Sequence, residues 1–159
     1  MRKANQEIKD NSILEEILKQ TQICRIAMLN NGEPYILPFN YGYHKNCIYI
    51  HSAPEGKKIE LLKKNPKVCF ELEQESKLIK GETACKWSTL YRSIVGYGFI
   101  EILTGFEEKI QGLDIIMKQH GAKGKMEFNK KEVDFIVILK LTITSMRGKH
   151  SGNWNKIMD

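Results

Sequence analysis

Apolar residues recur at two kinds of spacing along this chain, and each spacing predicts a different element. Steps of three and four residues predict a short amphipathic helix from Asn11 to Gln20. Alternating or continuous apolar runs bounded by turn residues predict strands instead. The six expected strands cover residues 22–29, 34–43, 47–51, 67–73, 91–103 and 134–144.

Two more helices are expected between these strands, each after a capping motif. Ser52 and Glu55 have the spacing of a capping box, so we expect a helix from there to about Asn65, where the following proline ends it. Thr104 and Glu107 repeat that spacing before the last helix. Short linkers and the lack of a repeated β-α-β pattern favour a mainly β, α+β fold: a closed or nearly closed antiparallel barrel with peripheral helices.

The expected strand 34–43 has two unlike faces. Alternate positions carry bulky side chains on one face: Tyr35, Leu37, Phe39, Tyr41 and Tyr43. The opposite face is unusually bare and carries Ile36, Pro38, Asn40 and Gly42. Because proline cannot donate a ladder hydrogen bond, Pro38 belongs at a sheet edge or irregularity, where backbone groups are free for a ligand. An ordinary edge strand explains the pattern equally well.

Composition and charge narrow the class of protein. The 159 residues suit one domain, residues 1–159, and 42% hydrophobic with 28% charged residues is ordinary globular composition. The net charge of +6 permits an anionic partner, but the scattered lysines favour a solvated basic surface over nucleic-acid binding. With no signal-peptide pattern and no apolar run of membrane length, we expect a cytoplasmic protein without membrane or nucleic-acid partners. Four widely spaced cysteines are expected to be free thiols, with no zinc site: Cys24, Cys47, Cys69 and Cys85.

The densest group of chemistry-bearing residues lies where the third strand gives way to the second helix. His51, Ser52, Lys57 and Lys58 fall there. A helix start has unpaired N–H groups and a partial positive charge, and the lysines add full charges, so an anion such as phosphate would bind well. A capped helix that binds nothing also fits the pattern.

Two glycines mark a second place of interest. Gly96 and Gly98 share one face of the fifth strand, shortly after Arg92 and Ser93. Glycines at this spacing allow either a bend in a barrel or the close approach of a flat group.

Five motifs together resemble one family. They are residues 34–43 (PYILPFNYGY), 48–53 (IYIHSA), 56–58 (GKK), 65–70 (NPKVCF) and 91–98 (YRSIVGYG). In this order and spacing they are similar to the 5-nitroimidazole antibiotic resistance family, which belongs to the pyridoxamine 5′-phosphate oxidase-like flavoproteins. The resemblance covers roughly residues 1–145.

The resemblance implies a six-stranded antiparallel split β-barrel that forms a homodimer and binds two FMN molecules where the subunits meet. Carried over to this chain, the stretch Leu37, Pro38, Phe39 and Asn40 would lie along the flavin ring, mainly through backbone groups. His51 and Ser52 would line the path from ring to phosphate. Lys57 and Lys58 would bind the phosphate, and Ser93 would contact the flavin from the long strand.

The tail, residues 146–159, departs from the pattern of true pyridoxamine phosphate oxidases. Those enzymes hold pyridoxal phosphate with a tail rich in arginine, histidine and tryptophan, whereas this tail has only residues 147–150 (RGKH) and Trp154. The departure argues against vitamin B6 oxidation. Trp154 either stacks near the flavin of the partner subunit or anchors the tail as a plain hydrophobic residue.

The resemblance leads to one main functional expectation and one alternative. The main expectation is an FMN-dependent oxidoreductase, similar to a nitroreductase, that takes electrons from NAD(P)H and reduces small aromatic acceptors such as a nitroimidazole. His51 is the candidate for proton delivery or substrate contact, because the pKa of histidine lies near neutrality; a histidine that only braces the strand end fits as well. The alternative is a binding protein without turnover, which holds flavin or haem.

Overall fold

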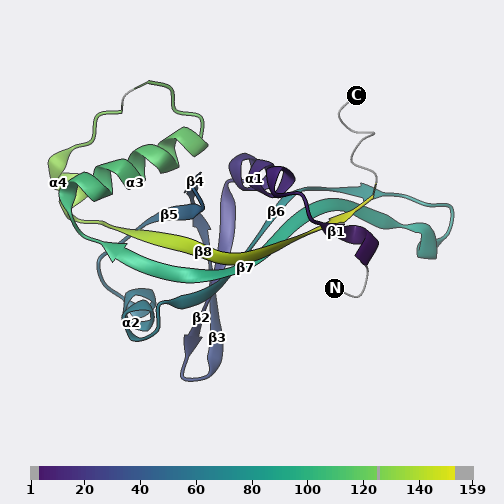
Figure 1. The fold of residues 1–159 in the computed structure, drawn as a ribbon, viewed down its shortest axis with the longest axis horizontal. Helices are drawn as coiled ribbons and strands as arrows, with labels where there is room; N and C mark the ends of the chain where they lie inside the picture. The colour runs from purple at the N-terminus through teal and green to yellow at the C-terminus, as the bar shows by residue number, and fades with distance from the viewer. Residues whose placement is uncertain (1–3, 125, 153–159) are drawn as a thin grey trace.

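The computed structural model describes residues 4–124 and 126–152, in which helices surround one antiparallel sheet (Figure 1). The helices are α1 (Asn11–Gln20), α2 (Lys57–Lys64), α3 (Phe106–Gln119) and α4 (Lys130–Asp134). The strands are β1 (Glu7–Ile8), β2 (Ile23–Asn30), β3 (Glu33–Asn40), β4 (Gly42–His44), β5 (Cys47–Ser52), β6 (Lys67–Ile79), β7 (Ser88–Leu103) and β8 (Val137–Ser151). Short 3-10 turns occupy Ala4–Gln6 and Ala84–Lys86.

The strand order explains why the sheet closes on itself. Neighbouring strands run β3-β2-β6-β7-β8-β5-β4, with β1 added beside β8. The two ends of this path, β3 and β4, are successive pieces of one segment that only Tyr41 separates. Such a sheet is a barrel with a split, and it confirms the expected mainly β, α+β split-barrel fold. Among the described residues, six long strands build the barrel, and β1 and β4 are short additions.

Local sequence signals account for the first elements. The Asp10 carboxylate accepts a hydrogen bond from the Ser12 backbone N–H at 2.8 Å and caps α1. Asn31 and Gly32 both have positive φ, 51° and 90°, which is the tight-turn conformation that an Asn-Gly pair favours between two strands.

The core lies inside the barrel and under α1. Inward side chains of the long strands, among them Ile26, Phe70 and Ile94, are at most 1% exposed. On α1, Ile17 and Leu18 are fully buried in the same cluster. Burial of this kind is the main force that holds the barrel together.

The predicted strand 34–43 is in fact two strands, because Tyr41 leaves the sheet and enters the core. Its side chain is fully buried, and its hydroxyl donates a hydrogen bond to the Leu18 carbonyl oxygen at 2.7 Å and also contacts the Thr21 hydroxyl. Burial raises the pKa of the Tyr41 hydroxyl well above its usual value. The Gln119 side-chain amide donates to the carbonyl oxygens of Leu18 and Thr21, so α3 is tied to the end of α1 at the same place.

Three strands are longer than predicted. β6 and β7 continue past the barrel as a two-stranded arm, residues 77–90, which projects clearly in Figure 1. Both faces of the arm meet solvent over much of its length. The arm therefore carries polar residues on both faces and lacks the alternation of apolar and polar residues that predicts a strand. β8 begins after α4, at Val137, and runs to Ser151, so the first part of the predicted tail is a strand.

Two further features are the state of the cysteines and the character of the helices. All four cysteines are free thiols, as expected; Cys24 and Cys47 are buried, and Cys85 is exposed. Within residues 4–124 and 126–152, no helix has both the length and the apolar character that crossing a membrane requires.

Candidate functional site at the split of the barrel

The split leaves two strand edges without partners, and α2 begins beside them. Among the described residues β3 pairs only with β2, so its other edge is open. β4 covers only residues 47–49 of β5, so among the described residues His51 and Ser52 have β8 on one edge and no strand on the other. Open edges offer backbone N–H and C=O groups to a ligand. Backbone donors and acceptors therefore gather at the split.

The start of α2 corrects the predicted capping box. Ser52 still belongs to β5, where it pairs with Val137, and its buried hydroxyl donates to the Ala53 carbonyl oxygen at 2.9 Å. A residue held in a ladder cannot also begin a helix, so α2 starts later, at Lys57. Its N-cap is Gly56, whose φ of 102° few other residues adopt. No side chain in the described part of the chain caps this helix start, which leaves its first N–H groups open to an anion.

Both predicted phosphate-binding lysines lie beside β3. Lys57 Nζ is 4.5 Å from the centroid of the Tyr35 ring. Lys58 Nζ is 6.0 Å from the centroid of the Phe39 ring, at the outer limit of a cation–π contact. The helix start, its two ammonium groups and β3 thus lie next to one another.

The two faces of β3 are as unlike as the alternation predicts. Leu37 and Phe39 are half-buried and pack against the core cluster, whereas Pro38 and Asn40 are exposed. Pro38 lies on an end strand of the sheet path, which agrees with the expected edge position. The four residues Leu37–Asn40 therefore lie beside the split, with their backbone along its open edge.

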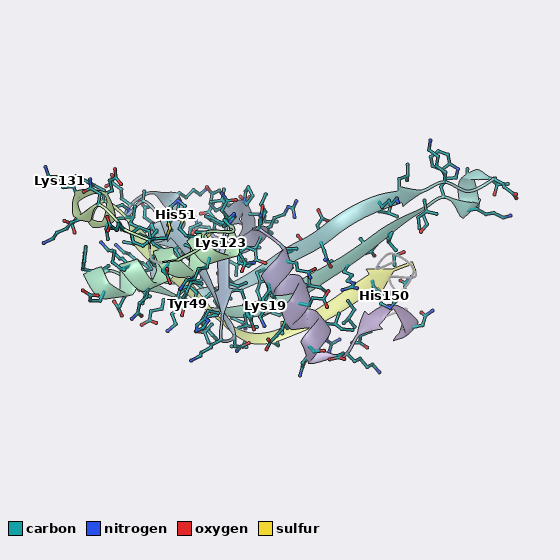
Figure 2. All side chains as sticks on the ribbon, turned by 90° about the horizontal axis from the view of Figure 1, so that it is seen from above. Lys19, Tyr49, His51, Lys123, Lys131 and His150 are labelled. Atoms are coloured by element: carbon teal, nitrogen blue, oxygen red, sulfur yellow. The ribbon has the colours of Figure 1, made fainter. Side chains whose placement is uncertain are left out.

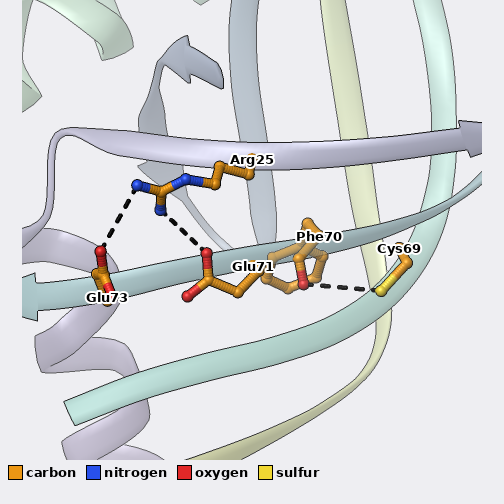
Figure 3. Close-up of polar contacts among 5 residues, drawn as sticks. All are labelled: Arg25, Cys69, Phe70, Glu71 and Glu73. Carbon is orange, nitrogen blue, oxygen red and sulfur yellow. Dashed lines mark hydrogen bonds and ion pairs between the residues drawn. The ribbon is translucent and has the colours of Figure 1, made fainter. Parts of the chain in front are cut away.

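A charged network next to Pro38 was missed at the sequence level. Arg25 is the cross-strand partner of Pro38, and its guanidinium contacts Glu71 at 3.1 Å and Glu73 at 3.5 Å (Figure 3). Burial raises the pKa of the Glu71 carboxyl above its usual value, although Arg25 opposes this change. A hollow of about 480 Å³ opens here, lined by Gln20, Thr21, Gln22, Ile23, Arg25, Glu73 and Gln74. The alternating pattern of β2 predicts that the Arg25 side chain points outward. It does not predict which acidic residues Arg25 contacts.

His51 and Ser93 lie in different regions of the molecule. His51 is exposed at the end of β5 and is level with Leu103 of β7, because both pair with Ile138. Ser93 is ten residues from Leu103 along β7, on the order of 33 Å at the usual rise per residue. Its neighbour in sequence, Arg92, pairs with His150, and Figure 2 shows His150 and His51 far apart. Within one chain, Ser93 is therefore remote from His51, and it pairs instead with Glu73 of the Arg25 network.

The predicted glycine pair has a structural explanation. Gly96 and Gly98 are both buried on the inner face of β7. The flat group that approaches Gly96 is the ring of Phe70, and at Gly98 the close neighbour is the Thr142 carbonyl oxygen. The two glycines therefore serve close packing inside the barrel. Trp154, the last candidate residue, lies outside the described residues.

Comparison with known proteins places this geometry in a family. The family model described as pyridoxamine 5′-phosphate oxidase matches residues 10–150. The chain belongs to this pyridoxamine 5′-phosphate oxidase family. The matched range contains β3, α2 and β7.

Several solved structures have a similar fold. A candidate 5-nitroimidazole antibiotic resistance protein from Bacteroides thetaiotaomicron is 32% identical, with a TM-score of 0.80 over 91% of this chain and 86% of that one. An FAD- and haem-binding protein from Mycobacterium smegmatis is 18% identical, with a TM-score of 0.83 over 94% and 75%. A flavocytochrome from Azotobacter vinelandii is 17% identical, with a TM-score of 0.81 over 96% and 72%. The last two show the fold alone.

One further relative matches only a part of this chain. An uncharacterised protein of Rhizobium meliloti is 35% identical over 52 residues. That segment is 33% of this chain and spans only 34% of the relative's length.

Proposed function

We propose that this chain is a flavoprotein that holds the phosphate of FMN at the start of α2. The observation that carries the proposal is the placement of Lys57 and Lys58 at a helix start that no side chain caps, next to the open edge of β3. The flavin-binding descriptions of two fold relatives support the choice of a flavin.

The residues at the split fit a terminal phosphate group. The open N–H groups and the partial positive charge of the helix start attract an anion, and two ammonium groups add charge-assisted hydrogen bonds. Ser52 lies four residues before Gly56, at the end of β5, with its hydroxyl bonded to the Ala53 carbonyl oxygen. FMN carries such a phosphate and riboflavin does not, so this site would prefer FMN over riboflavin.

The flavin ring would lie along β3, with backbone groups of Leu37–Asn40 at its edge. Ser93 lies on β7, and two strands, β2 and β6, separate it from β3 in the same chain. We therefore propose a homodimer in which Ser93 of one copy serves the site of the other. Three large exposed apolar side chains lie on the same face of β7 as Ser93: Val95, Tyr97 and Phe99, each 45–50% exposed. An exposed apolar stripe of this size is typical of an interface.

The dimer gives a direct prediction. Replacing Tyr97 and Phe99 together by glutamate should convert a dimer into a monomer, because four carboxylates would have to be buried without partners. Sedimentation equilibrium measures the mass. Phe135→Glu is the matched control, since Phe135 is 78% exposed and lies between α4 and β8, outside the stripe on β7, and it should leave the dimer intact. Wild-type protein that sediments as a monomer at all concentrations would refute the proposed dimer.

The proposed activity is reduction of small aromatic acceptors, such as a nitroimidazole, with electrons from NAD(P)H. When bound, FMN supplies the hydride transfer, and the protein contributes position and electrostatics. His51 is placed to deliver a proton or contact a substrate, since its side chain is exposed at the rim of the split. The alternative is a protein that stores flavin or holds haem without turnover.

The experiment that tests the proposal is identification of the ligand that copurifies with the protein. Mass spectrometry should find FMN, and the absorption spectrum should show the two flavin bands in the near ultraviolet and the blue. Anaerobic oxidation of NADH or NADPH with a nitroaromatic acceptor then separates an enzyme from a flavin store. A single intense Soret band would favour haem, and a colourless protein that ignores added flavin would contradict the proposal.

A further inference from the structure

Tyr35 lies beneath one of the two lysines on which the proposed phosphate site depends. Its ring centroid is 4.5 Å from Lys57 Nζ. Tyr35 is half-buried and packs against the main core cluster, whereas Lys57 is exposed. A ring fixed by the core therefore contacts a side chain that would otherwise move freely in solvent.

This contact matters for an anion that binds at the start of α2. A free lysine side chain loses much of its rotamer freedom when it binds a ligand, and that loss weakens binding. A cation–π contact already confines the ammonium group in the empty protein. It does not consume the hydrogen-bonding capacity of the ammonium group, because an ammonium has three N–H donors and the ring occupies one side of it.

We propose that Tyr35 is a positioning residue that holds the Lys57 ammonium at the start of α2, ready for a terminal phosphate group. The inference rests on the proposed function and adds to it that affinity for the phosphate depends on an aromatic ring at position 35. Phe39 stands in the same relation to Lys58, but the distance of 6.0 Å makes it the weaker of the two. We therefore expect Tyr35 to contribute more than Phe39 to the affinity for the phosphate.

The test compares two ligands that differ only in the phosphate, FMN and riboflavin, in titrations followed by quenching of flavin fluorescence. Tyr35→Leu should weaken FMN binding by about twofold to fivefold, the range expected for loss of one exposed cation–π contact. Riboflavin binding should be nearly unchanged. Tyr35→Phe keeps the ring and should bind FMN like the wild type.

Two further variants separate positioning from general packing. In a Lys57→Ala background, Tyr35→Leu should cause no additional loss of FMN affinity, because the lysine that it positions is absent. Phe106→Leu removes the ring that lies 6.0 Å from Lys130, outside the split, and should change neither affinity. Thermal unfolding and the retained riboflavin affinity show that each variant is folded.

The outcomes distinguish this inference from the proposed function. Equal weakening of FMN and riboflavin by Tyr35→Leu would mean that Tyr35 only supports the fold. Tighter FMN binding would mean that the ring competes with phosphate for Lys57. If Tyr35→Leu has no effect while Lys57→Ala weakens FMN, the phosphate site stands and the positioning role is wrong. If neither variant affects FMN, the phosphate site itself is wrong.

Discussion

Replacing both Lys57 and Lys58 by alanine is expected to weaken FMN binding at least about a hundredfold. Removal of a hydrogen bond between charged groups typically costs about 1.5–3 kcal/mol, so the two together cost about 3–6 kcal/mol. Riboflavin, which has no phosphate, should bind almost as well as before. Fluorescence titration of both ligands, or calorimetry, measures the two affinities.

The same helix provides a matched control. Lys63 and Lys64 lie in the last turn of α2 and are exposed, so Lys63→Ala with Lys64→Ala removes the same charge from the same helix. This control should leave FMN affinity within a small factor of the wild type, because surface charges that far from the helix start are screened. Similar losses in both double variants would show that overall charge attracts FMN and that the start of α2 is not the site.

Dependence on salt gives a second readout of the same prediction. If the lysines contact the phosphate, FMN affinity of the wild type should fall as the salt concentration rises, and this fall should be much smaller in the Lys57→Ala, Lys58→Ala variant. Riboflavin affinity should respond little to salt in either protein. A salt effect that survives the double substitution would place the phosphate elsewhere.

Much of the barrel could be predicted because its strands obey a strict alternation. Strand 34–43 is the clearest example: its bulky positions Leu37 and Phe39 do face the core, and its bare positions Pro38 and Asn40 do face out. The turn at Asn31 is equally open to prediction, because its geometry depends on two neighbouring residues alone. Features set by adjacent residues or by period-two burial are visible in a sequence.

Features set by distant partners were not visible. Tyr41 fits the alternation of its strand, yet the strand breaks there because its hydroxyl finds the Leu18 carbonyl oxygen at the end of α1. Ser52 fits a capping box, yet pairing with Val137 keeps it in β5. In both cases a contact made in the folded chain outweighs a local preference.

The candidate site also combines features that could be predicted from the sequence with features that could not. The lysines after β5 could be predicted from one stretch of sequence. The contact of Lys57 with Tyr35 could not, because it joins residues twenty-two positions apart on a helix and a strand. The Arg25 network likewise joins β2 to β6 through side chains. Position in the sequence therefore identified the charges, and only the fold identified what holds them.

The second prediction with a large effect concerns the packing of α3 against β4. Gly42, the first residue of β4, is buried against α3, and a Cβ atom there would lie 2.6 Å from the backbone carbonyl carbon and oxygen of Ile115. Backbone cannot move aside as a flexible side chain can. Gly42→Ala should therefore push α3 from the sheet and lower the free energy of unfolding by about 2–3 kcal/mol. For a chain of this size that is a fall in Tm of roughly 5–10 °C in a thermal scan.

Gly105→Ala is the matched control for this prediction. Gly105 precedes α3 with an ordinary φ of −66°, and the nearest atom to an added Cβ is the end of the flexible Glu108 side chain. The control should cost less than about 1 kcal/mol, since only a helix cap is altered. Gly42 lies two residues after the end of β3, so a displaced α3 should also widen the split. Binding of FMN and binding of riboflavin should then weaken alike, in contrast to the lysine variants. An unchanged Tm for Gly42→Ala would mean that α3 does not pack against β4 as closely as this fold requires.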